Sequence, residues 1–216
     1  MDLTKSYRDV VPASLLERYD FRETRNAATV LRATNPGSFE DILAVLDSFW
    51  LSRDDMLPGG NKSDVASRLD TAFRERGWRE GRHDTRIESS LKRLPWLPAG
   101  ELAPTLLKSE VLNEGYKVDN VKGRLAVDVE WNAKDGNLDR DLAAYRALYE
   151  AGILDGAAII TRTQDDLRAR AATLGVARWL ATTTTTNLAK LVPRLTRGDS
   201  GGCPLLVAAI TARCLR

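Results

Sequence analysis

Two short apolar runs in the second half of the chain constrain its fold most. GAAIITR (156–162) and CPLLVAAIT (203–211) contain few polar side chains. Runs of this length and composition are typical of strands that are buried on both faces of a sheet. The segments 137–152 and 163–175 lie on either side of the first run and have the pattern of helices. The order predicts an α/β core, a mixed central β-sheet surrounded by helices.

A third strand precedes these runs and carries two acidic side chains. In RLAVDVEW (124–131), one face of the expected strand is large and apolar, with Leu125, Val127 and Val129. The other face carries Ala126, Asp128 and Glu130. Side chains two positions apart point to the same face of a strand, so Asp128 and Glu130 lie side by side. Asp119 precedes them in YKVDN (116–120), which is either a paired strand or the turn before one.

These three carboxylates are the candidate metal site. Adjacent carboxylates on a sheet repel each other unless a cation or a proton lies between them. Carboxylate oxygens suit Mg²⁺, which keeps several waters and takes only a few protein ligands. The alternative is an exposed strand face that is acidic without binding a metal.

Charge is distributed unevenly along the chain, although the formal net charge is only +2. Residues 100–155 contain 7 basic and 11 acidic side chains, whereas residues 156–216 contain 9 basic and 3 acidic ones. This distribution suits a carboxylate cluster for a cation beside a surface for a polyanion, but it also fits solvated faces of no special role.

Composition excludes several classes of protein. Hydrophobic residues make up 43% and charged residues 29%, as in a globular protein, and no apolar run is long enough to span a membrane. Two cysteines and a single histidine, His83, cannot form a disulfide framework or a zinc cluster. We expect one cytoplasmic domain over residues 1–216. Residues 1–115 are predicted to be mainly helical, including segments 86–94 and 100–112, and residues 116–216 to form the α/β core.

The segment 117–162, with its two acidic strands, following helix and apolar strand, resembles the catalytic core of restriction endonucleases of the BglII, BstYI and BamHI group. Asp119 matches the first aspartate of that group, and Asp128 matches the first acidic residue of its second strand. Glu130 matches the position that is Gln in the BglII type and Glu in the BamHI type. The resemblance covers roughly residues 116–211, and GWRE (77–80) resembles the segment just before the core.

The resemblance implies a Mg²⁺-dependent type II endonuclease of the PD-(D/E)xK superfamily that hydrolyses DNA phosphodiesters. It implies that Asp119, Asp128 and the carbonyl of Val129 bind Mg²⁺, and that Glu130 orients or deprotonates the attacking water. Glu80 matches a further polar residue that the group takes from a preceding helix, and otherwise it is an exposed glutamate at a helix end. Asp128 departs from the usual Glu and is one methylene shorter, which changes its reach toward a metal.

Candidate DNA contacts lie in loops and helix starts that combine long cations with amides and hydroxyls. Alternatives are a solvated helix face for the arginines of segment 74–86 and a flexible loop for the threonine run 182–186. The residues we single out are Lys62, Ser63, Asn132, Lys134, Asn137, Thr184, Thr185, Asn187, Lys190 and Arg194.

We therefore expect a sequence-specific double-stranded DNA endonuclease that acts on a short palindromic site as a homodimer and has no membrane segment. One alternative is a DNA-binding module of the same fold that has lost catalysis. Another is a nuclease of a different defence or repair system.

Overall fold

The computed structural model describes residues 1–56, 64–176 and 184–216, which form two compact units. The first unit comprises residues 1–81 and 117–216, and the second comprises residues 82–116. The helices are α1 (Tyr7–Val10), α2 (Ala13–Arg18), α3 (Ala27–Thr34), α4 (Pro36–Ser48), α5 (Asp64–Glu75), α6 (Gly136–Glu150), α7 (Asp165–Thr173) and α8 (Leu188–Arg197). The strands are β1 (Tyr19–Thr24), β2 (Arg79–Arg82), β3 (Thr85–Arg93), β4 (Thr105–Asn113), β5 (Lys117–Lys122), β6 (Leu125–Val129), β7 (Gly156–Arg162) and β8 (Leu205–Ile210).

A six-stranded mixed sheet in the order β1-β8-β7-β6-β5-β2 forms the centre of the first unit. Strands β6, β7 and β8 are parallel, whereas β1 and β5 run antiparallel to β8 and β6. Every residue of β6, β7 and β8 is buried, which explains why β8 is apolar throughout and why β7 is apolar up to Thr161 and Arg162. The prediction of a mixed sheet surrounded by helices is confirmed.

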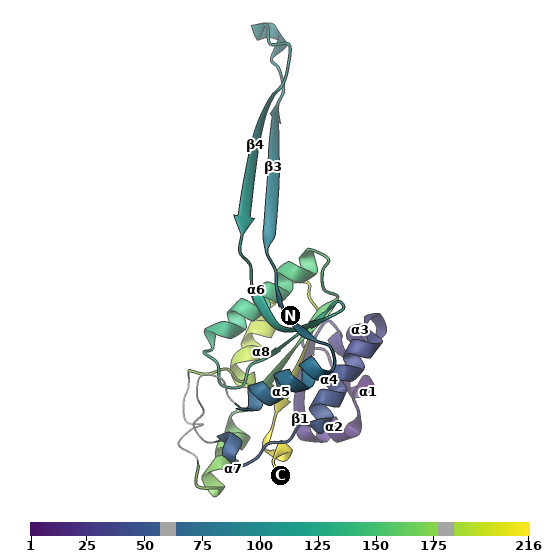
Figure 1. Ribbon diagram of the computed structural model, residues 1–216, viewed down its shortest axis with the longest axis vertical. Helices are drawn as coiled ribbons and strands as arrows, with labels where there is room; N and C mark the ends of the chain where they lie inside the picture. Colours follow the sequence, from purple (N-terminus) through teal and green to yellow (C-terminus); the bar gives the residue numbers. More distant parts are fainter. Residues whose placement is uncertain (57–63, 177–183) are drawn as a thin grey trace. The chain divides into compact units, whose positions relative to one another are not determined.

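Helices cover both faces of this sheet (Figure 1). Leu125, Val127 and Val129 of β6 face a core that includes side chains of α4 and α5. Ala126 faces the opposite core, which includes leucines of α6 and α8. The alternation predicted for β6 is therefore present, and it turns Asp128 toward the layer that contains α6.

The first half of the chain is less helical than predicted. It contains β1, whose Tyr19 and Phe21 are buried and whose six residues pair with β8. Because β1 and β2 form the two edges of the central sheet, the core does not begin at residue 116. No helix in the described residues is long and apolar enough to cross a bilayer.

The second unit is a β-hairpin, so the prediction of helices over 86–94 and 100–112 is wrong. Ile87 and Leu91 are four residues apart, a spacing that suits one face of a helix and also one face of a strand. Nine paired positions between β3 and β4 decide for the strand. All side chains of β4 are exposed, and the unit of residues 82–116 has no hydrophobic core of its own. Because a domain requires its own core, this second unit does not decide whether the chain forms one domain, and the single domain stays a prediction.

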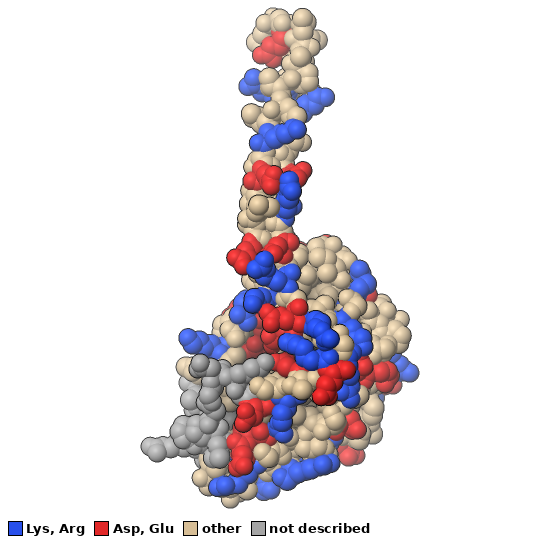
Figure 2. Space-filling model, viewed as in Figure 1, with Lys and Arg blue, Asp and Glu red and all other residues tan. Residues whose placement is uncertain are grey.

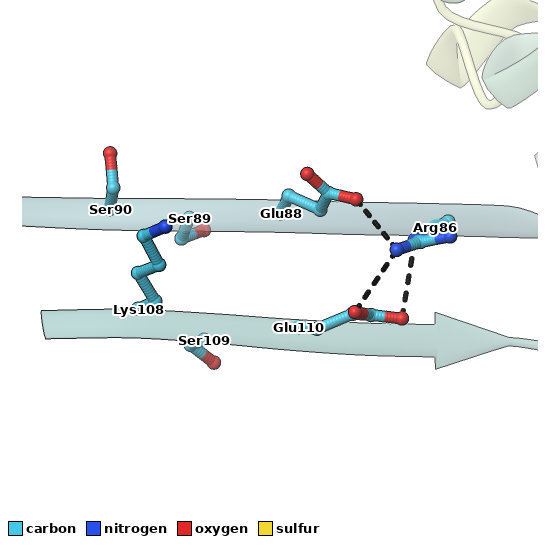
Figure 3. Close-up of a pocket in the computed structure, with 7 residues that line it drawn as sticks. All are labelled: Arg86, Glu88, Ser89, Ser90, Lys108, Ser109 and Glu110. Atoms are coloured by element: carbon cyan, nitrogen blue, oxygen red, sulfur yellow. Dashed lines mark hydrogen bonds and ion pairs between the residues drawn. The ribbon is translucent and has the colours of Figure 1, made fainter.

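Charged side chains of both signs are interspersed along this hairpin (Figure 2). Arg86 lies between Glu88 and Glu110, at 2.8 and 3.2 Å (Figure 3). Such exposed pairs contribute little to stability.

Candidate active site

The acidic residues of β5, of β6 and of the position directly after β6 lie in one neighbourhood at the carboxyl end of β6. Asp128 and Glu130 are each only 4% exposed, so the alternative of an exposed acidic strand face is wrong. Asp119 lies on β5, and its backbone N–H donates a 2.7 Å hydrogen bond to Oδ1 of Asp128. The segment 116–120 thus supplies a paired strand, and the three predicted acidic residues belong to one neighbourhood.

Helix α6 adds two side chains that the sequence analysis did not assign to the site. Asp141 is 2% exposed and lies close enough to Glu130 for its charge to raise the pKa of that residue, and the Tyr145 hydroxyl donates to Oδ2 of Asp128. Asp141 lies three residues after Leu138 and four before Tyr145, on the stripe that packs against the sheet. A carboxylate on that apolar stripe is the signal that marks Asp141.

Burial and mutual repulsion raise the pKa of three of these carboxyl groups. Desolvation is the largest cause for Asp128, Glu130 and Asp141. The charge of Asp141 further raises the pKa of Asp128 and of Glu130. Arg140, which contacts Asp141 at 3.3 Å, opposes the rise for that residue. The cluster therefore holds protons near neutral pH unless another cation replaces them.

Two oxygen atoms of the cluster have no hydrogen-bond partner. They are Oε2 of Glu130 and Oδ2 of Asp141, both fully buried. In the described ranges, no three His, Cys, Asp or Glu side chains are gathered to hold a metal ion as they stand. Bare, buried carboxylate oxygens nevertheless have the chemistry that a hard divalent cation requires, so the residues present fit such an ion.

The segment 184–186, the described part of the threonine run, is hydrogen-bonded directly to this site. The hydroxyls of Thr161 and Thr186 both donate to the carbonyl oxygen of Glu130, at 2.9 and 3.0 Å. The amide of Thr186 also donates to the carbonyl of Ala133 at 2.9 Å, and Thr185 forms an isolated bridge with Lys134. The loop that follows β6 and the segment 184–186 are therefore held together beside the carboxylates.

Arg162, a fully buried residue at the end of β7, binds both the loop that follows β6 and the segment 184–186. Its guanidinium donates to the carbonyl of Trp131 and to the hydroxyl of Thr185, each at 2.9 Å, and to the side chain of Gln164. Arg162 was not predicted from the sequence, because it ends a run that is mostly apolar.

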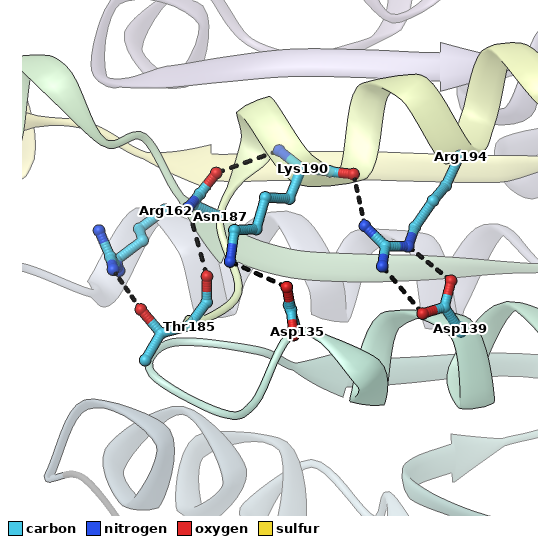
Figure 4. Close-up of polar contacts among 7 residues, drawn as sticks. All are labelled: Asp135, Asp139, Arg162, Thr185, Asn187, Lys190 and Arg194. Carbon is cyan, nitrogen blue, oxygen red and sulfur yellow. Dashed lines mark hydrogen bonds and ion pairs between the residues drawn. The ribbon is translucent and has the colours of Figure 1, made fainter. Parts of the chain in front are cut away.

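The cations predicted to contact DNA on α8 are paired within the protein (Figure 4). Lys190 contacts Asp135 at 3.0 Å, and Arg194 contacts both oxygens of Asp139 at 2.6 and 2.8 Å. Asn187 is buried as the N-cap of α8, where its side chain accepts the backbone N–H of Lys190 at 3.1 Å. These contacts explain the positions of the three residues without DNA.

The remaining DNA candidates differ in exposure. Asn132, Lys134 and Thr184 are exposed, whereas Asn137 and Thr185 are half-buried. Lys62 and Ser63 lie outside the described residues. Three candidates thus present side chains to solvent close to the carboxylates.

Comparison with protein-family models matches residues 19–210 to Restriction endonuclease BglII/BglIII. This chain belongs to the BglII/BglIII restriction endonuclease family. The match includes all six strands of the central sheet and every residue of the carboxylate cluster. Membership makes the protein a restriction endonuclease, a nuclease that acts on specific DNA sequences. A comparison with curated proteins found no match.

Glu80 lies within the region that matches the family, but not in the expected local structure. The prediction that it ends a helix is wrong, because it belongs to β2. Its side chain is half-exposed and contacts Lys117 of β5 at 3.1 Å. Val129, whose carbonyl is a candidate ligand, is the last residue of β6 and is buried.

Proposed function

We propose that this protein is a Mg²⁺-dependent type II restriction endonuclease that hydrolyses phosphodiester bonds of double-stranded DNA. We place it in the BglII/BstYI/BamHI-like group of the PD-(D/E)xK superfamily, acting as a homodimer on a short palindromic site. The observation that carries the proposal is the buried cluster of Asp128, Glu130 and Asp141, with two oxygens that lack any partner.

Asp119, Asp128 and the carbonyl oxygen of Val129 are the proposed Mg²⁺ ligands, and Asp141 is a further candidate from α6. When bound, the ion stabilises negative charge that develops on the phosphate and lowers the pKa of the attacking water. Tyr145 and the backbone N–H of Asp119 hold the Asp128 carboxylate in position. Asp128 is one methylene shorter than the usual Glu. We propose that the carboxylate of Asp141 compensates for the shorter side chain by binding the same ion.

Glu130 is the proposed general base. Its position corresponds to the lysine of the superfamily pattern, but a glutamate can accept a proton from water. Burial and the nearby carboxylates raise the pKa of Glu130 to about 9 in the metal-free protein. A cation bound beside it would lower that pKa and leave the carboxylate free to accept a proton from water. The hydroxyls on its carbonyl oxygen hold the backbone of Glu130 in place.

DNA contacts are proposed for the exposed members of the site. Lys134 binds a phosphate by charge, Thr184 by its hydroxyl, and Asn132 can bind a phosphate or the edge of adenine. Lys190 and Arg194 keep their ion pairs and shape α8 beside this surface.

Cleavage of unmethylated phage DNA in Mg²⁺ buffer tests this function. We expect discrete fragments from the native chain and none from Asp119→Ala, whose fold is checked by circular dichroism. A folded native chain that shifts DNA in a gel without cutting it would instead indicate a binding module. Degradation without discrete fragments would indicate a nuclease of another kind.

The stability of the metal-free protein is expected to fall as the pH rises from about 5 to about 9. The pKa values of Asp128 and Glu130 are raised in the folded protein, so it binds more protons than the unfolded chain. This stability is complete below the ordinary carboxylate pKa and is lost as the pH rises through the raised values. Mg²⁺ is expected to reduce the loss because it binds only the folded protein. Thermal unfolding at several pH values, with and without Mg²⁺, measures both effects, and a Tm that rises with pH in metal-free buffer would contradict them.

A further inference from the structure

Strand β4 has a long free edge. It contains nine residues, TLLKSEVLN, with no proline. Among the described residues β4 pairs with β3 alone, so its other edge is free. Leu106, Leu107 and Leu112 are 53%, 64% and 71% exposed. An exposed apolar edge strand without a bulge or proline is a template for pairing with another chain.

The sequence of β4 is complementary to itself around Ser109. If two copies pair antiparallel about this residue, Lys108 of each copy lies opposite Glu110 of the other, which brings together opposite charges. In the same register Leu107 lies opposite Val111, and Leu106 lies opposite Leu112. The three cross-strand pairs nearest the centre on either side are therefore favourable.

Strand β3 lacks this complementarity. Pairing two copies around Ser89, the residue opposite Ser109 in the hairpin, sets Arg86 against Lys92. Like charges directly opposite each other destabilise a strand pair. Of the two free edges, β4 is therefore the one that suits a second copy of the same strand.

The charge of the hairpin favours a protein partner over DNA. Residues 82–116 contain five basic and five acidic side chains, so the unit has no excess of positive charge for phosphates. The register of β3 and β4 also places Ile87, Leu91, Leu107 and Val111 on one face, and all four are exposed. Pairing two hairpins joins these apolar faces into one continuous surface.

We propose that β4 pairs antiparallel with β4 of a second copy of this chain about a twofold axis through Ser109, which joins the two hairpins into a four-stranded sheet. The inference rests on the homodimer of the proposed function and assigns one of its surfaces. It does not depend on the carboxylate site, so the tests below measure assembly and leave cleavage as a separate result.

Engineered disulfides locate the axis. In the proposed pairing the two Ser109 residues are neighbours, at a separation that a disulfide spans. We expect Ser109→Cys to form a covalent dimer under mild oxidation, and Ser89→Cys, an equally exposed position on β3, not to do so. The native Cys203 and Cys214 are buried and do not compete. Equal cross-linking of both variants, or none of Ser109→Cys, would overturn the proposal.

A charge exchange tests the register in solution. Lys108→Glu and Glu110→Lys each place like charges opposite each other twice, so either variant alone is expected to dimerise about ten-fold more weakly. An equimolar mixture of the two restores opposite charges at both positions and should dimerise like the native chain. Analytical ultracentrifugation of the three samples gives the dissociation constants. A monomeric native chain, or a mixture no tighter than the single variants, would overturn the pairing, whereas cleavage lost only in Asp119→Ala would still support the nuclease.

Discussion

The Asp128→Asn variant is expected to lose DNA cleavage by about a thousand-fold and yet to unfold at a higher temperature than the native chain in metal-free buffer above neutral pH. Asparagine keeps the size of the side chain and can still accept the N–H of Asp119. It removes a negative charge that burial and Asp141 disfavour. We expect a rise in Tm of about 2–4 °C, which corresponds to about 1 kcal/mol for a chain of this size.

The control for this variant is Asp165→Asn, the same change at an exposed carboxylate in the first turn of α7. It should leave cleavage unchanged and should not raise the Tm, because Asp165 interacts favourably with the helix dipole. Differential scanning calorimetry and a cleavage time course measure both properties. If Asp128→Asn were both destabilised and fully active, Asp128 would be a structural residue.

The Arg162→Met variant is expected to have the largest effect on stability, a loss of about 2–4 kcal/mol in the free energy of unfolding. Methionine leaves the buried carbonyl of Trp131 and the side chains of Thr185 and Gln164 without their donor. Urea denaturation measures the loss. Because Arg162 also holds the segment 184–186 against β6, the amide of Thr186 should exchange its hydrogen faster than in the native chain.

Arg170→Met is the matched control, since Arg170 is exposed on α7. It should change the free energy of unfolding by no more than about 0.5 kcal/mol. Equal effects of the two substitutions would show that the hydrogen bonds of Arg162 do not hold the segment, and an unchanged exchange rate at Thr186 would show the same.

Local patterns were sufficient to predict the centre of the fold and part of the site. Strands β6, β7 and β8 are buried on both faces or alternate, and both patterns can be recognised in the sequence. Asp119, Asp128 and Glu130 were identified from their spacing, and the structure places them near one another. Asp141, the carboxylate of α6 beside Glu130, was not identified, because it resembles the acidic residues that begin many helices.

The hairpin shows why local patterns fail elsewhere. Leucine and isoleucine residues four positions apart suit helix and strand equally, and only the pairing of β3 with β4 distinguishes the two. Likewise β1 was missed because it is a short edge strand whose partner, β8, is nearly two hundred residues away in the sequence. In neither case does the sequence of the segment itself indicate which strand it pairs with.

The sequence by itself determined the buried strands, the helices between them and the two-residue spacing of Asp128 and Glu130, because each depends on residues close together in the chain. Tertiary structure decided that those carboxylates are buried, that Asp141 and Tyr145 of α6 face them, and that the threonine segment is attached to Glu130. The reason is physical: desolvation and repulsion between carboxylates arise only when separate segments exclude water from the same space.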